Sequence, residues 1–407
     1  MALRCHFTEL SQAGRRLPRA RFFGIVAAMQ TGLDKIALGF DHGLAGKRVA
    51  LLVNHTAVDR WGRHAVQVFR GLRGVSVVRL LGPEHGVWGT HQDMEAVAGG
   101  APDPVFGVPT LSLYGGDRQS LDPRPEAFDD VDAVVYDIQD IGARYYTYGA
   151  TLAFVMEAAA ERGVPVWVLD RPNPLGPAVE GPLLKPGFES FCGIVPGLPI
   201  RHGMNVGDLA RWYRERVAPG CELHVVPCDR HGRPPWVPPS PNMPTLETAL
   251  VYPGLCLLEG TTVSEGRGTT TPFLSFGAPG VDPVALVDAL RARECPGVDF
   301  VPTRFRPAFG KHAGEVCGGV YLRVFDATAL SSVTLGVYVL HALRQVAPDA
   351  FGWRTDAYEF VTDVPAIDLL WGSADLRETL DRGDDVGGLM TKARAETRGW
   401  SSGVGSA

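Results

Sequence analysis

Runs of apolar residues alternate with helical periodicity over residues 48–170, a pattern typical of parallel strands joined by crossover helices. Buried strands rich in Val and Leu are predicted at 48–54, 75–81, 133–137 and 166–170. Between the last two, residues 147–162 carry apolar side chains at helical spacing, and Gly163 and Pro165 end that helix. Continuous apolar strands indicate a sheet covered on both faces, so we predict an α/β fold with a Rossmann-like, doubly wound, mostly parallel sheet.

The pattern changes after Gly280. Helices are predicted at 282–293 and 332–345 and a strand at 319–324, which together favour a smaller α+β domain. We therefore expect a Rossmann-like domain over residues 30–280 and an auxiliary α+β domain over 281–407. A proline-rich segment, residues 233–244, is predicted to be stiff and extended, either as a wall of a site or as a plain connector.

Residues 1–29 form an N-terminal extension of ambiguous meaning. Four arginines precede a short apolar stretch at 22–28, which is a weak signal-peptide pattern, although Met29 is an alternative natural start. We expect a cytoplasmic protein, with export as the alternative. Elsewhere the sequence contains no apolar stretch of membrane-spanning length, so stable membrane insertion is not expected.

Composition narrows the kinds of partner. The 407 residues carry a net charge of -6, which gives no general attraction to nucleic acid. The seven cysteines lack the spacing of metal or disulfide motifs, so we expect no metal ion and reduced, mostly buried thiols. Because glycine-rich dinucleotide and phosphate-binding motifs are also missing, we expect no cofactor. The oligomeric state stays open.

Polar residues follow the predicted strands closely. Ligands of open parallel sheets bind beyond the carboxyl ends of the strands, so these residues are the first candidates for binding a substrate. Tyrosine rings among them offer flat apolar faces with a polar tip, which suits sugars. The candidate binding residues are Asn54, His85, Asp140, Arg144, Tyr146, Asp170, Arg171, Asn173, His202, Asn242 and Arg267.

Three glutamates are candidates for acid/base chemistry. Glu84, between Pro83 and Gly86 after an apolar strand, is expected to lie partly out of water, which favours the protonated acid that a catalytic proton donor needs. Glu180 and Glu265 compete for the second role, because glycoside cleavage uses a pair of carboxyl groups. The segment 264–270 around Glu265 is equally compatible with a tight glycine-rich turn held by an ion pair.

The chain resembles one bacterial family in several motifs that occur in the family's order. These motifs are residues 82–86 (GPEHG), 137–148 (DIQDIGARYYTY), 169–174 (LDRPNP), 179–182 (VEGP), 239–245 (PSPNMPT) and 259–270 (EGTTVSEGRGTT). The family is that of the exo-β-N-acetylmuramidases of peptidoglycan recycling. The resemblance implies a cleft between a Rossmann-like domain and a smaller C-terminal domain, and release of N-acetylmuramic acid from the non-reducing end of cell-wall fragments. It implies Glu84 as one catalytic glutamate, with Glu180 or Glu265 as its partner.

The resemblance also gives a reason for arginines in the site. A guanidinium binds the lactyl carboxylate of a muramic acid through two parallel hydrogen bonds, and Arg144, Arg171 and Arg267 are the candidates. Residues 89–95 depart from the family pattern by lacking a lysine, which leaves substrate contacts there open. Two other functions stay possible at this stage: a non-catalytic protein that binds sugars or muropeptides in the same cleft, and a metal-dependent hydrolase.

Overall fold

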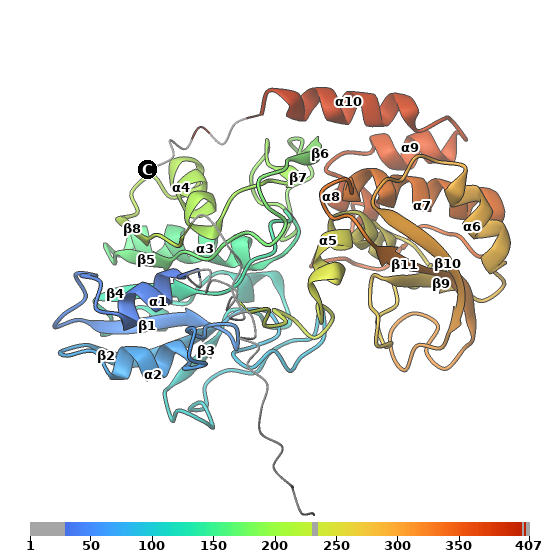
Figure 1. Cartoon of the computed structure of the whole chain (residues 1–407). Coiled ribbons are helices and arrows are strands. Elements are labelled where there is room, and N and C mark those ends of the chain that lie inside the picture. The colour runs from blue at the N-terminus through green and yellow to red at the C-terminus, as the bar shows by residue number, and fades with distance from the viewer. Residues whose placement is uncertain (1–28, 230–234, 401–402, 404–407) are drawn as a thin grey trace, which may run out of the picture.

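The computed structural model describes residues 29–229, 235–400 and 403. It contains a large α/β part at the N-terminal side and a smaller part at the C-terminal side, which pack against each other (Figure 1). The predictions made for residues 1–28 and for the first residues of the proline-rich segment lie outside the described residues. The cytoplasmic location and the alternative of export therefore stay predictions. Within the described part, no helix is both long and apolar enough to span a bilayer.

A parallel sheet of six strands forms the centre of the N-terminal part, in the order β3-β2-β1-β4-β5-β8. All neighbouring strands pair in parallel. The strand order reverses between β1 and β4, which is the switch point of a doubly wound fold. The strands are β1 (Arg48–Val53), β2 (Ser76–Gly82), β3 (Thr110–Ser112), β4 (Ala133–Asp137), β5 (Val166–Leu169) and β8 (Leu223–Val226).

Helices cover both faces of this sheet, as the continuous apolar strands predict. Alternate residues of β1 point to opposite faces: Leu51 packs in the cluster that contains Phe69 of α2, and Leu52 in the cluster that contains Met156 of α3. The predicted Rossmann-like fold is thereby confirmed, and the four predicted strands and the predicted helix match to within one residue at every boundary. The helices of this part are α1 (Gly32–Ala37), α2 (Ala65–Arg70), α3 (Tyr148–Glu161) and α4 (Val206–Arg216).

The smaller part combines helices with an antiparallel sheet of three strands, in the order β10-β11-β9. Its α+β character is as predicted. Its elements are α5 (Leu246–Leu255), β9 (Ser275–Ala278), α6 (Pro283–Arg291), β10 (Val298–Phe305), β11 (Cys317–Val324), α7 (Ser332–Val346), α8 (Ala366–Trp371), α9 (Asp375–Asp381) and α10 (Gly387–Arg398). The expected start of this domain at Val281 stays a prediction, although α5 and β9, which precede Val281, pack with α7 and β11.

A two-stranded hairpin, β6 (Glu180–Leu183) and β7 (Pro199–Arg201), connects the two parts. Helix α10 packs against β6, and Lys185 forms an ion pair of 2.7 Å with Glu396 of α10. Figure 1 shows α10 crossing from the smaller part back over this hairpin. The C-terminal helix is therefore anchored to both parts of the molecule.

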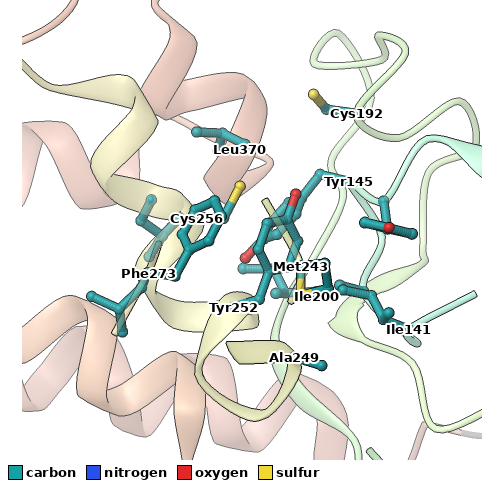
Figure 2. Close-up of a cluster of buried hydrophobic side chains, with 14 of the residues drawn as sticks. Ile141, Tyr145, Cys192, Ile200, Met243, Ala249, Tyr252, Cys256, Phe273 and Leu370 are labelled. Carbon is teal, nitrogen blue, oxygen red and sulfur yellow. The ribbon is translucent and has the colours of Figure 1, made fainter. Parts of the chain in front are cut away.

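Apolar side chains from both parts meet in one buried cluster (Figure 2). Tyr145 of the N-terminal part packs edge-on against Tyr252 of α5 at 5.8 Å, and the Tyr145 hydroxyl donates a hydrogen bond to the carbonyl of Pro253. Tyr252 in turn packs edge-on against Phe273 at 4.9 Å. Burial of large aromatic rings between the two parts holds them together and fixes the residues that lie at the edge of the cluster.

Candidate active site

Glu84 lies in a small pocket between the two parts, which we call the Glu84 pocket. Its wall includes the aromatic cluster of Figure 2, through Tyr145, Tyr252 and Phe273. The polar residues that line it are Glu84, His85, Asp93, Tyr146, Thr147, Tyr148, Ser240, Asn242, Glu259, Arg267, Tyr358 and Glu359. The pocket has a volume of about 40 Å³, which is room for very few water molecules.

Two hydrogen bonds fix the carboxylate of Glu84, which is only 4% exposed. Thr147, the residue before α3, donates its hydroxyl to Oε2 at 2.6 Å, and the backbone N–H of Met94 donates to Oε1 at 3.3 Å. Glu84 follows β2 directly, so the end of the sheet sets its position. The carboxylate is thus held in one orientation towards the pocket.

Residues 89–95, where the family lysine is missing, form part of the same wall. Besides the Met94 N–H, Gln92 accepts a hydrogen bond of 2.8 Å from Asn242, and Asp93 pairs with Arg267 at 3.2 Å. His85, with a positive φ of 67°, binds back to this segment through Nδ1 and the carbonyl of His91, 2.9 Å apart. The segment therefore braces the pocket even without a lysine.

Among the described residues that line the pocket, Arg267 is the one arginine, and three carboxylates surround it. Its guanidinium lies 2.7 Å from Glu259, 3.2 Å from Asp93 and 3.5 Å from Glu265. The loop that carries it depends on Gly266, whose φ is +83° and where a Cβ would overlap the carbonyl oxygen of Ser275. The prediction of a glycine turn held by a Glu–Arg pair describes this loop well, and the turn also places Arg267 in the pocket.

A wider groove continues from the Glu84 pocket and shares Asp93, Glu259 and Arg267 with it; we call it the Lys311 groove. Its volume is about 440 Å³. Glu265 lies here and not in the Glu84 pocket, and it accepts a hydrogen bond of 2.9 Å from Lys311. The Lys311 ammonium also donates to the carbonyls of Leu258 and Val263, so it ties Glu265 to the backbone of its own domain.

The structure brings five of the fourteen predicted site residues into the Glu84 pocket and a sixth, Glu265, into the adjoining groove. The five are Glu84, His85, Tyr146, Asn242 and Arg267. The buried hydroxyl of Tyr146 makes no hydrogen bond of good geometry to a described residue, and its neighbours are the side chains of Ser240 and Tyr148. Burial raises the pKa of this hydroxyl well above its usual value, so it stays neutral and able to donate.

Glu180 lies outside both spaces. It forms an ion pair of 2.5 Å with Arg201 of the paired strand, and it accepts hydrogen bonds from the Ser331 hydroxyl and the Val333 N–H at the start of α7. A carboxylate at a helix N-terminus is stabilised by the unpaired N–H groups there. The structure therefore gives Glu180 a structural role in joining the hairpin to α7.

Five further predicted residues line neither the Glu84 pocket nor the Lys311 groove, and their side chains form hydrogen bonds to the backbone. The guanidinium of Arg144 donates to the carbonyls of Pro182, Leu198 and Leu370. Both carboxyl groups that follow β4 and β5 accept backbone N–H groups, Asp140 from Gly142 and Asp170 from Gly207. The remaining two, Asn54 and His202, likewise hydrogen-bond to nearby backbone, at Thr56 and Met204.

Arg171 and Asn173 line a separate cavity of about 610 Å³ at the carboxyl ends of β4 and β5. Arg171 is bound there to Asp137 by two hydrogen bonds of 2.5 and 2.9 Å. Asn173 donates to the carbonyl of Met204 and accepts from the Leu175 N–H. Both side chains therefore belong to the loops that follow the sheet and stand apart from Glu84.

Sequence reasoning missed seven polar side chains of the pocket: Asp93, Thr147, Tyr148, Ser240, Glu259, Tyr358 and Glu359. Glu259 occurs in one of the quoted motifs, so its position beside Arg267 had a sequence signal. Glu359 had none, because it lies in a hairpin turn between Tyr358 and Val361 that contains neither glycine nor asparagine.

A Rossmann-like sheet domain, a smaller domain and carboxyl groups gathered in the cleft between them define a class of hydrolase-like α/β proteins with an acidic site. The family model described as "Exo-beta-N-acetylmuramidase NamZ, N-terminal" matches residues 49–247, and its C-terminal counterpart matches residues 250–404. The chain therefore belongs to the exo-β-N-acetylmuramidase NamZ family, as the sequence motifs predicted.

Relatives agree with this assignment in sequence and in structure. The chain is 38% identical over 371 residues to the peptidoglycan β-N-acetylmuramidase NamZ of Bacillus subtilis, an alignment that spans 89% of this chain and 86% of the relative. Two crystal structures of DUF1343 family proteins from Bacteroides fragilis share the fold. One has a TM-score of 0.76 at 32% identity, over 91% of this chain and 94% of the other. The second has a TM-score of 0.68 at 28% identity, over 91% and 96%.

Proposed function

We propose that this protein is a glycoside hydrolase that releases N-acetylmuramic acid from the non-reducing end of peptidoglycan fragments, with Glu84 as a catalytic residue. Family membership supports the activity and the substrate class. The observation that carries the role of Glu84 is its buried carboxylate, held by Thr147 and Met94 and directed into a pocket between the two parts. A carboxyl group fixed in this way is held towards the pocket, where it can exchange a proton with a bound sugar.

We infer an orientation for the substrate from the size of the two spaces. The Glu84 pocket is lined by aromatic rings, which suit a sugar, but its volume of about 40 Å³ is smaller than a sugar ring, so we expect the surrounding side chains to move apart when the terminal sugar binds. The Lys311 groove, which joins it, is about ten times larger, and we expect it to hold the rest of the glycan fragment. Such an arrangement favours removal of one sugar at a time from the end of a chain.

Among the three arginines predicted to bind the lactyl carboxylate, Arg267 alone lines the pocket. Because Asp93, Glu259 and Glu265 already surround it, we expect it to be helped by Arg354 of the groove. The Arg354 guanidinium lies 5.1 Å from the Tyr358 ring and donates to the carbonyl of Ala357, which holds it at the groove's edge. A second cation there offsets the strong negative charge that would otherwise repel the lactyl group.

The test is an assay of the wild type and of Glu84→Gln on a chromogenic β-N-acetylmuramide, with the corresponding β-N-acetylglucosaminide as control. We expect the wild type to cleave the muramide alone, and Glu84→Gln to lose about 10²–10⁴-fold in kcat with an unchanged melting temperature. Binding without turnover by the wild type would instead favour a non-catalytic sugar-binding protein. Cleavage of the glucosaminide but not of the muramide would contradict the lactyl-carboxylate argument.

A further inference from the structure

Glu359 occupies the tip of a two-residue hairpin that reaches the Glu84 pocket. Tyr358 and Val361 exchange backbone hydrogen bonds of 3.0 and 2.9 Å, and the two residues between them have positive φ angles, 46° at Glu359 and 67° at Phe360. Turns of this kind normally use glycine or asparagine, since other side chains are strained there. A glutamate and a phenylalanine at these positions are costly for the fold, so contacts of their side chains must hold them.

Both parts of the protein supply those contacts. From the N-terminal part, the Tyr114 hydroxyl donates to Oε2 of Glu359 at 3.2 Å, and the Tyr114 ring lies 5.6 Å from the Phe360 ring. From the C-terminal part, the Tyr358 hydroxyl donates to Glu259 at 2.6 Å. The hairpin tip is thereby fixed on either side of the carboxyl group.

The carboxyl group of Glu359 is 6% exposed and lines the same pocket as Glu84. Within the described residues no Lys, Arg or His forms an ion pair with it, and Oε1 accepts no hydrogen bond. Burial and, next, the nearby charge of Glu84 raise the pKa of Glu359 well above its usual value. Two carboxyl groups that line one water-poor pocket repel each other when both are charged, which favours the protonated form of the buried Glu359.

A second polar group in the pocket is available to a ligand. The Tyr146 hydroxyl is buried, lines the same pocket, and has the side chains of Ser240 and Tyr148 as neighbours, without a hydrogen bond of good geometry to either. It can therefore turn its hydrogen towards a polar atom of a bound ligand. The two carboxyl groups and this hydroxyl come from three separate segments, after β2, before α3 and after α7, and converge on one space.

We propose that Glu359 is the proton-donating carboxylic acid of this site and that Glu84 is the carboxylate it works with. The inference rests on the proposed glycosidase function. When the bond between the anomeric carbon and the leaving oxygen breaks, Glu359 gives its proton to that oxygen. Water then adds its hydroxyl to the anomeric carbon and returns one proton to the carboxyl pair, so that Glu359 is protonated again for the next cycle.

The experiment compares two substrates that differ in their need for a proton. N-acetylmuramyl-N-acetylglucosamine has a poor leaving group that must be protonated, whereas dinitrophenyl β-N-acetylmuramide has a leaving group that departs as an anion. For Glu359→Gln we expect kcat to fall by about 10²–10⁴-fold on the disaccharide and by less than about tenfold on the aryl glycoside. The loss of activity at high pH, which reports deprotonation of the acid in the wild type, should vanish in the variant. Glu378→Gln, an exposed glutamate of α9, is the matched control and should behave as wild type.

Several results separate the possible errors. A wild type that cleaves the disaccharide while Glu359→Gln keeps its full rate overturns the role of Glu359 and leaves the proposed function standing. Preferential loss of the disaccharide reaction in Glu84→Gln instead would exchange the two roles and overturn the assignment. A wild type inactive on both substrates overturns the function itself. If Glu359→Gln does not fold, Tyr114→Phe carries the test: it removes a donor to Glu359, so the high-pH limb should move to higher pH, and an unmoved limb contradicts the proposal.

Discussion

Substitution of Glu180 by glutamine separates a structural glutamate from a catalytic one. Glu180 bridges the β6–β7 hairpin and the start of α7 through Arg201, Ser331 and Val333. The substitution preserves the shape of the side chain and an acceptor oxygen for the α7 N-terminus. It removes the negative charge that compensates Arg201, whose side chain is only 8% exposed.

The expected cost follows from that geometry. Removing one partner of a buried ion pair costs about 3–5 kcal/mol, because the other charge stays buried. Glu180 is 14% exposed, and Arg201 keeps a hydrogen bond to the carbonyl of Leu175, so partial screening and the retained acceptor reduce the loss. We expect Glu180→Gln to lower the free energy of unfolding by about 2–3 kcal/mol, with kcat within about twofold of wild type.

Urea unfolding followed by fluorescence measures the stability, and hydrolysis of the chromogenic muramide measures kcat on the same samples. Glu222→Gln is the control, because Glu222 pairs with His224 at the surface and is 69% exposed. A variant of wild-type stability that loses kcat by a hundredfold or more would refute the structural role and restore Glu180 as the partner of Glu84.

Three further predictions concern pH, the loop of Arg267 and metal ions. Burial raises the pKa of Asp140 to about 7, so its contribution to stability is complete below its unfolded pKa of about 4 and is lost as the pH rises through 7. We therefore expect Asp140→Asn, compared by urea unfolding with wild type, to lose less stability between about pH 5 and pH 8, whereas parallel curves would contradict the burial argument. Gly266→Ala should cost about 1–3 kcal/mol or more and lower kcat, since it strains the loop of Glu265 and Arg267; unchanged melting and turnover would show that the loop adapts. Activity on the muramide should persist after dialysis against EDTA, and loss that a divalent ion restores would favour the metal-dependent alternative.

The sheet domain was predictable because its central strands, β1, β4 and β5, are buried on both faces. Continuous apolar residues from Val49 to Val53 and from Val166 to Leu169 favour strands of a covered parallel sheet. The placement of Glu84 directly after β2 follows from the same logic, since the end of a strand fixes what comes next.

Other polar residues after the strands serve the backbone, and sequence alone does not distinguish the two uses. Asp140, Asp170 and Arg144 each satisfy buried N–H or C=O groups of loops that turn sharply over the sheet. Such groups must find partners, and the loops that need them become visible only in the folded chain. Glu359, by contrast, lines the pocket but could not be predicted to do so. Its turn lacks the glycine or asparagine typical of such turns, and it reaches the pocket only because the two parts pack together.

The shared aromatic cluster between the two family halves has a practical consequence. Tyr145 is covered by α5, and Tyr252 by residues that lie before it in the chain. Dividing the chain near residue 248 would expose, on each fragment, an apolar surface of aromatic rings that is buried in the whole protein. We therefore expect each fragment, expressed alone, to aggregate. Replacing one half by that of another protein would also require new side chains at the aromatic cluster between the halves.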